Sequence, residues 1–485
     1  MMNTKELNAK LAKLTGLSFS GKTRTESDLI GEREIPNELY LGVQTLRAIE
    51  NFQITGTTLR DFPYLVRALA EVKKAAAIAN TQLGLMSQDI CEAICKACDE
   101  IIAGKYHENF VVDLIQGGAG TSTNMCANEI IANRALEHLG KEKGEFKFCS
   151  PNDHVNLAQS TNDAYPTSLH LAFLYFNNDL VLALKNLIAS LKSKAKEFKG
   201  VIKMGRTQLQ DAVPMTLEQE FNAFAKTLEY EIENLNCAVS WLHNINMGAT
   251  AIGTGLNCHE KYPEICVSEL AKITKLPLVL TDDLIEATPD TSGFVSYSSA
   301  LKRLSVKISK ICNDLRLLSS GPRAGLGEIN LPKMQPGSSI MPGKVNPVIP
   351  EVVNQVCFKV FGNDTTVTFA SEAAQLQLNV MEPVIVESIY ESMTYLISAM
   401  DTLRTLCIDG ITANVEHCKK VVLHNIGIVT ALNPHIGYKV STSIAKEALE
   451  TGRGIYELVL EKGILDKEKL DKILEPESMC YFNIK

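Results

Sequence analysis

The stretch GSSIMPGKVNP, residues 337–347, gathers the residue types that could remove a proton from a small anion. Ser338 and Ser339 bring hydroxyl groups, Lys344 brings a cation and Asn346 brings an amide. A serine oxygen becomes a useful base only where backbone N–H donors, a nearby cation and exclusion of water favour its alkoxide. Four prolines limit the mobility of the segment: Pro336, Pro342, Pro347 and Pro350. We therefore predict a hinged flap that closes over a substrate and carries a reactive serine.

The Gly-Lys pair in this flap raises the alternative of a nucleotide-binding P-loop. That motif needs four residues between its glycines and a Ser or Thr after the lysine. Here five residues separate Gly337 from Gly343, and Val345 follows Lys344, so no hydroxyl is placed to hold magnesium. The spacing excludes this kind of nucleotide site.

Three more polar segments precede helical runs: GGAGTSTNMCANE (117–129), NDHVNLAQSTNDAYPTS (152–168) and MGRTQLQDAVPMT (204–216). Glycine lets a ligand approach the backbone closely, hydroxyls donate hydrogen bonds, and a helix N-terminus carries partial positive charge. Taken singly, each segment could be only a helix N-cap, and the first could be a degenerate dinucleotide loop. No clear strand precedes that loop, and it does not complete G-x-G-x-x-G. Together with the flap, the segments predict a cage for a small dicarboxylate.

The bulk composition limits the classes of protein that fit. The chain has 485 residues and a formal net charge of −8, and such a length suits about three domains. An acidic surface argues against non-specific nucleic-acid binding. No apolar run reaches the length of about eighteen residues that a membrane span requires. Residues 1–27 lack an apolar signal core and are expected to form a loose leader. We expect a cytoplasmic protein.

Three of the thirteen cysteines, Cys91, Cys95 and Cys98, have the C-x3-C-x2-C spacing of some iron–sulfur enzymes. Such a cluster needs thiolates that converge from a loop. These cysteines instead lie within DICEAICKACDEIIAG, whose apolar positions repeat at helical spacing and which ends at Gly104. We therefore interpret them as small, half-buried helix residues. So long a chain with this many cysteines does not indicate a disulfide framework either.

Long helices must position the polar segments, because apolar residues recur every three or four positions through the middle of the chain. Such stripes run through residues 180–198, 301–318 and 386–407, and residues 215–242 supply another long helix. Between residues 351 and 407 we expect one long helix, kinked or broken near Pro383. Strand patterns are short and scattered, so the predicted fold is mainly α with a central bundle of long helices. Several stripes are apolar on more than one side, which predicts burial against other subunits.

Five motifs together resemble the aspartase/fumarase superfamily, whose members eliminate ammonia or water from four-carbon or related acids to give fumarate. They are GGAGTSTNMCANE, QSTND, GRTQLQDAVP, GATAIGTGLN and GSSIMPGKVNP, in the family's order and spacing. The resemblance, from about residue 28 to nearly the C-terminus, implies a three-domain subunit and a homotetramer with a 20-helix core. The domains would span 28–161, 162–416 and 417–485, after the leader 1–27. Each active site would take residues from three subunits.

Within the superfamily, NPVIPEVVNQVCFKVFGNDTTVT and QLQLNVMEPVI are similar to the aspartase branch more than to class II fumarases. That likeness implies reversible elimination of ammonia from L-aspartate through an aci-carboxylate intermediate, without a metal or an organic cofactor. Ser338 would be the base that takes the Cβ proton, and Asn162 would orient the leaving amine. The β-carboxylate would be held by Thr121, Ser160, Thr161 and Ser339. The α-carboxylate would be bound by Lys344, Asn346 and Thr207.

Two departures from the family pattern affect the prediction. Many members have histidine where this chain has Gln208, so the usual imidazole cannot assist, although some aspartases share the glutamine. We keep Gln208 as a substrate-binding residue. Fumarases have a second dicarboxylate site around an H-P-N-D stretch, and because Ser150 replaces that histidine here, we do not predict this site. His154 in the same stretch is interpreted as a structural or loop histidine.

Two other functions stay open. The first is a class II fumarase, which would interconvert malate and fumarate, and the choice between L-aspartate and L-malate separates the two enzymes. The second is a non-catalytic structural homologue. The intact Ser338, Lys344 and Asn346 argue against a scaffold, because a scaffold has no use for a reactive loop.

Overall fold

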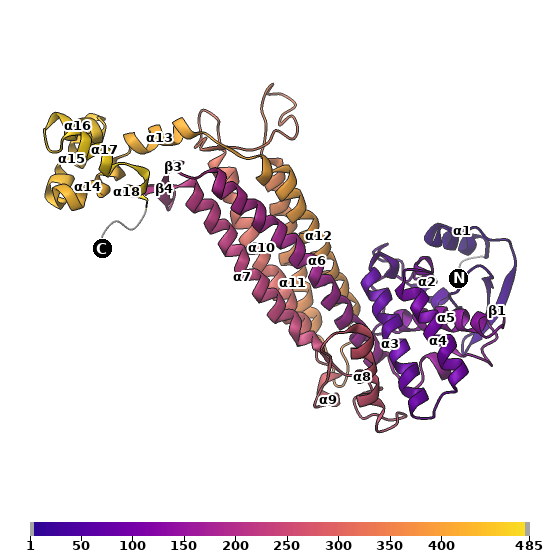
Figure 1. Ribbon diagram of the computed structural model, residues 1–485. Coiled ribbons are helices and arrows are strands. Elements are labelled where there is room, and N and C mark those ends of the chain that lie inside the picture. Colours follow the sequence, from indigo (N-terminus) through magenta and orange to yellow (C-terminus); the bar gives the residue numbers. More distant parts are fainter. Residues whose placement is uncertain (1–3, 481–485) are drawn as a thin grey trace. The chain divides into compact units, whose positions relative to one another are not determined.

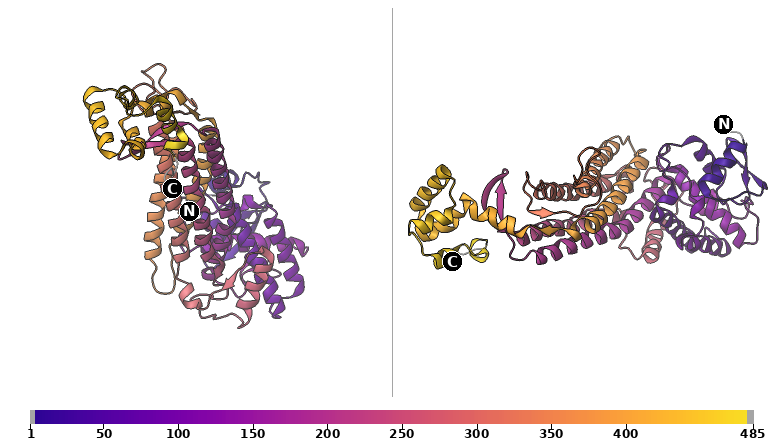
Figure 2. Two further views of the ribbon diagram at one scale, coloured as in Figure 1. Left: turned by 60° about the vertical axis from the view of Figure 1, so that its left-hand side comes forward. Right: turned by 90° about the horizontal axis from the view of Figure 1, so that it is seen from above.

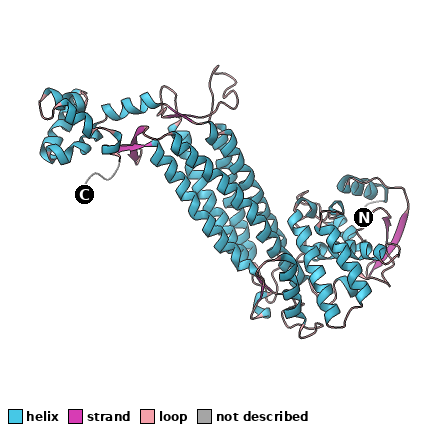
Figure 3. Ribbon diagram, viewed as in Figure 1, coloured by secondary structure: helices cyan, strands magenta, loops and turns pink. Residues whose placement is uncertain are grey.

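The computed structural model describes residues 4–480, which divide into two compact units. The first unit contains residues up to 180, 234–302 and 360–394. The second unit contains residues 181–233, 303–359 and those from 395 onward. Helices make up most of both units, and the strands are short (Figure 3). The prediction of a mainly α fold is confirmed.

Short and medium helices precede the long ones in the first unit (Figure 1). Along the chain these are α1 (Thr4–Thr15), α2 (Val43–Asn51), α3 (Pro63–Gln82), α4 (Gln88–Ile102) and α5 (Thr121–His138), with α8 (Tyr262–Thr274) and α9 (Leu284–Ala287) further on. Helix α3 packs against α4, α5 and α8. Its many alanines allow this, because small side chains let helices approach closely. Both α5 and α6 begin at segments that the sequence marked as polar loops.

The long helices are α6 (Thr161–Glu197), α7 (Leu217–Ser240), α10 (Ser292–Leu318), α11 (Val348–Glu372) and α12 (Glu382–Leu406). Within each unit, parts of these helices lie alongside one another (Figures 1 and 2). In the first unit the Tyr297 hydroxyl of α10 donates to the Asn177 amide oxygen of α6 over 3.0 Å. In the second unit the Asn354 amide of α11 donates to the Ser309 hydroxyl of α10 over 2.8 Å. The predicted long-helix bundle is confirmed.

The break predicted near Pro383 is present, and residues 373–381 separate α11 from α12. Pro383 is the second residue of α12. Proline is well tolerated in a first helical turn, because the N–H group that it lacks would have no partner there.

Four two-stranded sheets are described, and each is small. Antiparallel pairs join β1 (Thr23–Asp28) to β2 (Gly31–Pro36), β3 (Ile202–Thr207) to β4 (Gln210–Thr216), and β7 (Ile329–Asn330) to β8 (Thr412–Ala413). The fourth pair, β5 (Asn244–Ile245) with β6 (Val279–Leu280), is parallel. In the β3–β4 hairpin the register shifts between Met204 and Arg206. This hairpin carries two of the predicted site residues.

The C-terminal helices form a cluster in the second unit (Figures 1 and 2). They are α13 (Val415–His424), α14 (Val429–Ile436), α15 (Tyr438–Thr451), α16 (Ile455–Glu461), α17 (Lys467–Ile473) and α18 (Pro476–Met479). Their core of leucine, isoleucine and valine side chains also includes Ile202 and Met204 of β3. Elsewhere along the chain, single-turn helices lie at residues 59–61, 107–109, 151–155, 241–243, 408–410 and 426–428. The predicted three-domain boundaries remain a prediction.

The expectation of a loose leader over residues 1–27 is wrong for most of that range. Residues 4–15 form α1, in which Leu7 and Leu11 are buried. The Lys10 ammonium donates to the Ile49 carbonyl oxygen over 2.7 Å, and Thr23 begins a strand. Leu7 and Leu11 lie one helical turn apart, so a single face of this lysine-rich helix is apolar enough to dock. Residues 1–3 lie outside the described part of the chain.

The thirteen cysteines, all within residues 4–480, form no disulfide, and Cys237 on α7 is the one among them whose side chain is exposed. Cys91, Cys95 and Cys98 lie on α4, and two of them are buried, which confirms their interpretation as helix residues. Among residues 4–480, no helix is both long and apolar enough to cross a membrane.

Candidate active site

The first turn of α6 presents three of the predicted site residues, Ser160, Thr161 and Asn162. The sequence folds this way because Ser160 and Asp163 form a reciprocal helix cap. The Ser160 hydroxyl accepts from the Asn162 N–H over 3.2 Å, and the Asp163 carboxylate accepts from the Ser160 N–H over 3.0 Å. The cap fixes both hydroxyl-bearing residues at the positive end of a 37-residue helix.

The Asp163 carboxylate also holds the segment GATAIGTGLN (248–257) against this helix end. Its Oδ2 atom accepts from the backbone N–H groups of Gly248 and Thr250, over 3.1 and 2.9 Å. Asp163 is fully buried, and burial raises its pKa to about 6. A side chain at Gly248 would place its Cβ atom 2.4 Å from the Pro263 ring, so glycine is required for this approach. The segment therefore supports α6.

The first turn of α5 lies against the first turn of α6. Thr121 opens α5, and its hydroxyl donates to the Gly118 carbonyl oxygen over 2.8 Å. Gly120 has φ +85°, and a Cβ atom there would lie 2.2 Å from the Tyr165 ring of α6. The Asn124 amide nitrogen of α5 donates to the Thr161 hydroxyl oxygen over 3.2 Å. The first unit thus brings Thr121, Ser160 and Thr161 to two adjoining helix N-termini, which together favour an anion.

Asn162 presents the acceptor end of its amide. The side-chain nitrogen donates to the Ala251 carbonyl oxygen over 2.7 Å, and this contact fixes the amide orientation. The Asn246 amide in turn donates to the Asn162 carbonyl oxygen over 3.1 Å. With its nitrogen committed to the backbone, Asn162 retains the Oδ1 oxygen for a donor such as an ammonium group.

The flap belongs to the second unit, and it closes on itself at its base. The Gly337 N–H donates to the Lys344 carbonyl oxygen over 2.7 Å, and the Asn346 amide donates to the Gly337 carbonyl oxygen over 2.7 Å. The Ser338 hydroxyl oxygen accepts from the N–H groups of Ile340 and Met341, over 3.2 and 2.9 Å. Ser339 and Lys344 are exposed. The loop itself therefore supplies the backbone N–H donors that a reactive serine needs.

Thr207 and Gln208 lie at the exposed tip of the β3–β4 hairpin. Gln208 and Leu209 both have positive φ, +55° and +61°, as in a type I′ turn. Such backbone strain in residues other than glycine is found most often at functional sites. Below the tip, Arg206 contacts the buried Glu328 carboxylate over 2.7 Å and Lys203 contacts it over 3.1 Å. These ion pairs fasten the hairpin to the segment that leads into the flap.

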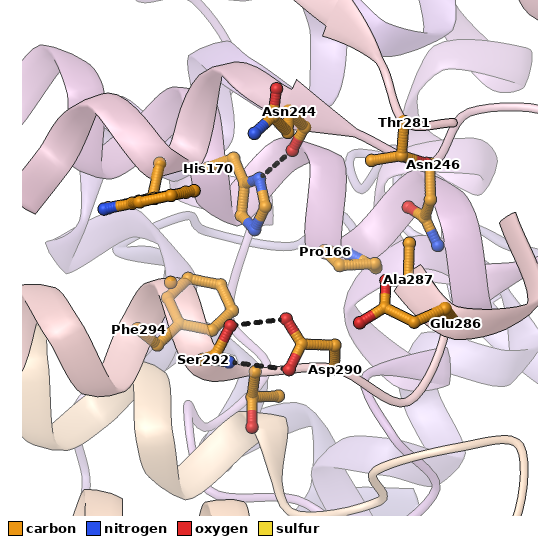
Figure 4. Close-up of a pocket in the computed structure, with 13 residues that line it drawn as sticks. Pro166, His170, Asn244, Asn246, Thr281, Glu286, Ala287, Asp290, Ser292 and Phe294 are labelled. Atoms are coloured by element: carbon orange, nitrogen blue, oxygen red, sulfur yellow. Dashed lines mark hydrogen bonds between the residues drawn. The ribbon is translucent and has the colours of Figure 1, made fainter. Parts of the chain in front are cut away.

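Figure 4 shows a separate cavity of about 250 Å³ in the first unit, and none of the predicted site residues lines it. The His170 ring donates through Nδ1 to the Asn244 carbonyl oxygen over 2.9 Å, and burial lowers its pKa to about 4. Opposite this ring, the Asp290 carboxylate accepts from the hydroxyl and the N–H of Ser292 (Figure 4). We do not place the active site in this cavity, because it lacks a cation for a dicarboxylate.

His154 has a structural role, which is one of the two interpretations made from the sequence. Its Nδ1 atom accepts from the Ser150 N–H over 2.8 Å, within a single helical turn at Pro151–Val155. Both residues are thus occupied in local structure.

Comparison with known proteins decides the family. Residues 31–362 match the family described as "Lyase", and residues 428–481 match "Fumarase C C-terminus". This chain belongs to the lyase family. Among its relatives, the aspartate ammonia-lyase of Helicobacter pylori is 58% identical over 94% of this chain and 97% of its own. The aspartate ammonia-lyase of Escherichia coli K12 is 54% identical over 96% and 97% of the two chains.

Solved structures of the lyase family show the same fold. A fumarate lyase:delta crystallin from Brucella melitensis has a TM-score of 0.92 and 54% identity, over 95% of this chain and all of its own. The class II fumarase of Schistosoma mansoni has a TM-score of 0.87 and 33% identity, over 96% of this chain and all of its own. The predicted membership of the aspartase/fumarase superfamily is confirmed.

Several residues that support this lyase site escaped prediction. Asp163 could have been found, because Ser-x-x-Asp before a helix is a capping signal. Lys73, Asn156 and Gln159 make up a polar group, which Asn124 links to the Thr161 hydroxyl. Lys73 gave one faint signal, which is that a lysine stands among the mostly apolar buried residues of α3.

Proposed function

We propose that this lyase is an aspartate ammonia-lyase, which eliminates ammonia from L-aspartate to give fumarate and catalyses the reverse addition. The relatives that carry this name are 54–58% identical and cover nearly the whole chain. The observation that carries the chemistry is the pair of N–H donors on the Ser338 hydroxyl oxygen. A class II fumarase is the second candidate, favoured by the fumarase-type C-terminal match and by the Schistosoma mansoni structure.

Ser338 is the base in this proposal. Its alkoxide takes the Cβ proton of aspartate, and the electron pair of the C–H bond moves onto the β-carboxylate to give an aci-carboxylate dianion. The pair then returns to form the C=C bond, the C–N bond breaks, and ammonia leaves with the electrons of that bond. The N–H donors of Ile340 and Met341 stabilise the alkoxide, and closure of the flap would remove water that competes for it.

The substrate carboxylates are assigned to different groups of donors. Hydroxyls would hold the β-carboxylate, where charge accumulates: Thr121, Ser160, Thr161 and Ser339. To donate to it, the Thr121 hydroxyl would turn away from the Gly118 carbonyl oxygen. Donors of this kind lower the barrier only if they bind the dianion more strongly than the ground-state carboxylate. A cation and polar side chains would bind the α-carboxylate: Lys344, Asn346 and Thr207. Asn162 would orient the amine through Oδ1, and Gln208 would contact the substrate where many relatives use histidine.

We further propose a cytoplasmic homotetramer in which each site draws residues from three subunits. Large apolar side chains are exposed on all the long helices: Leu182, Tyr230, Val306, Val352, Phe369 and Tyr395. Exposed apolar surface on this scale is typical of helices that other subunits cover. The proposed steps use hydroxyls, amides and one ammonium, so we expect turnover without an added metal or organic cofactor.

The decisive test is the formation of fumarate, followed by its absorbance, after L-aspartate or L-malate is added to the purified protein. The proposal expects fumarate from L-aspartate and little or none from L-malate. Fumarate from L-malate alone would make the protein a fumarase. A folded protein that turned over neither acid would favour the non-catalytic homologue.

A further inference from the structure

Lys73 is a fully buried lysine beneath the candidate site, in the first unit. It lies on α3, and none of its surface reaches solvent. Three amide oxygens accept from its ammonium group: Asn124 Oδ1 at 2.6 Å, Gln159 Oε1 at 2.8 Å and Asn156 Oδ1 at 3.0 Å. An ammonium group has three N–H donors, so these contacts satisfy it fully. A buried cation is costly to the fold, and its presence calls for a reason.

The contact with Asn124 settles which way that amide points. An ammonium only donates, so the atom of Asn124 that faces it must be the oxygen. The amide nitrogen therefore points away and donates to the Thr161 hydroxyl oxygen over 3.2 Å and to Asn156 Oδ1 over 3.1 Å. Asn124 is buried as well. The orientation of its amide thus follows from Lys73.

This contact also limits where the Thr161 hydroxyl hydrogen can point. A hydroxyl has one hydrogen, and when its oxygen accepts from Asn124 the hydrogen must be directed elsewhere. On α6 this leaves the O–H free to donate to an anion at the helix N-terminus. Hydrogen bonds that follow one another in one direction polarise each other, so the ammonium makes the hydroxyl a better donor.

We propose that Lys73 is a positioning residue for the reaction, which acts through Asn124 to direct the Thr161 O–H at the substrate β-carboxylate. The inference rests on the proposed function, because it takes the β-carboxylate as the group that Thr161 binds. Loss of the Lys73 ammonium should therefore change kcat more than KM, since charge on that carboxylate builds up in the transition state.

The charges around Lys73 fit this role. Burial lowers the pKa of Lys73 to about 7. The buried Asp163 carboxylate of α6 works to raise this pKa, and so do the thiols of Cys98 on α4 and Cys266 on α8. A neutral amine has two N–H donors for three amide oxygens, so the geometry matches the protonated form.

A double-mutant cycle tests the inference. In the tetrameric enzyme, Lys73→Met and Thr161→Val should each lower kcat about tenfold to a hundredfold, with KM for L-aspartate changed only a few-fold. In the Thr161→Val background, Lys73→Met should lower kcat by less than about threefold more, because the hydroxyl that Lys73 positions is already gone. If the two losses multiplied in full, Lys73 would not act through Thr161.

Asn124→Asp keeps the inference testable if Lys73→Met does not fold. The new carboxylate can still accept from the Lys73 ammonium, but it cannot donate to Thr161. We expect this variant to fold and to lose kcat to the same degree as Thr161→Val. A wild-type kcat in Asn124→Asp would overturn the inference.

A matched control separates positioning from stability. Lys194 is another buried lysine, and its ammonium donates to the Ile411 carbonyl oxygen over 2.9 Å in the second unit. Lys194→Met should lower the Tm but leave kcat within about twofold. An equal loss of kcat in this control would show that any buried lysine matters only for folding.

Different results would contradict the aspartase function and the positioning role of Lys73. If the wild type made fumarate from L-malate and not from L-aspartate, the aspartase proposal would fall, and the same cycle would be measured with L-malate. If L-aspartate were turned over but the two fold-decreases in kcat multiplied in full, only the proposed role of Lys73 would be wrong.

Discussion

The Ser338 hydroxyl oxygen accepts a hydrogen bond from the backbone N–H of Met341, 2.9 Å away within the same loop. The flap therefore carries N–H donors for this hydroxyl within its own sequence. If Ser338 is the base, as we propose, local backbone geometry would set its strength, and closure of the flap would add only the substrate and the exclusion of water.

Ser338→Ala should lower kcat by several orders of magnitude, because it removes the proposed base. Binding of fumarate, measured by its stabilising effect on Tm, should change little, since the hydroxyl acts mainly in the transition state. Ser319→Ala is the control, because that hydroxyl donates to the Leu315 carbonyl oxygen at the end of α10. A Ser338→Ala enzyme with near-normal turnover would remove the serine from the mechanism.

Two variants of low activity should restore activity to each other if sites are shared between subunits. Thr161→Ala and Ser338→Ala, co-expressed with different tags and purified through both, would form mixed tetramers. Some sites would then contain neither substitution, and random mixing would return activity to about a quarter of the wild type. Each variant expressed alone is the control. Mixed tetramers as inactive as the parents would place both residues in one subunit's site.

Gln208→His should add an ionisation to the pH profile of kcat/KM. The wild type has no imidazole at the hairpin tip, whereas the variant would place one there with a reference pKa of about 6.5. The exposed tip makes the substitution tolerable for folding. Superimposable profiles of the two enzymes would place this residue outside the chemistry.

Glu382 should make stability depend on pH. Its side chain is 3% exposed, and burial raises its pKa from about 4.5 to about 8. A raised pKa means that the contribution of the carboxyl to stability is complete below about 4.5 and is lost as the pH rises through about 8. Glu382→Gln stays neutral, so its Tm should rise relative to the wild type between about pH 6 and pH 9.

The exposed Glu92 of α4 offers the control for this measurement. Glu92→Gln should follow the wild-type Tm across the same pH range, because no charge is buried there. If Glu382→Gln also followed the wild type in parallel, folding would not raise the pKa of this carboxyl.

Leu11→Ala should destabilise the folded protein by about 2–4 kcal/mol, as truncation of a buried leucine does. Leu11 is fully buried in α1, and Lys13, two residues on, is exposed. Lys13→Ala should therefore be nearly neutral. Urea unfolding of the two variants decides whether α1 is docked, and equal midpoints would return this segment to the status of a loose leader.

Most of the fold and the functional loops could be predicted because they rest on local signals. The long helices show in the three- and four-residue spacing of their apolar positions. The flap shows in residue types that stand within ten positions of one another, and the turn at Ser160 shows in its hydroxyls.

What sequence could not supply was the long-range support of those loops. Lys73 and Asn124 are 51 positions apart, and Asp163 and Thr250 are 87 apart. Nothing local links such residues, because tertiary packing alone brings them together. Residues 4–15 were misjudged for a related reason, since three leucines among lysines give a weak apolar stripe until a partner surface is known.

The cysteine distribution gives an unmodified handle for labelling. Twelve thiols are buried or half-buried, whereas Cys237 on α7 is exposed. A maleimide dye should react there first, so that separate donor- and acceptor-labelled batches could be mixed. If the protein forms the proposed homotetramer, energy transfer between them would then report how fast its subunits exchange, without any change to the amino-acid sequence.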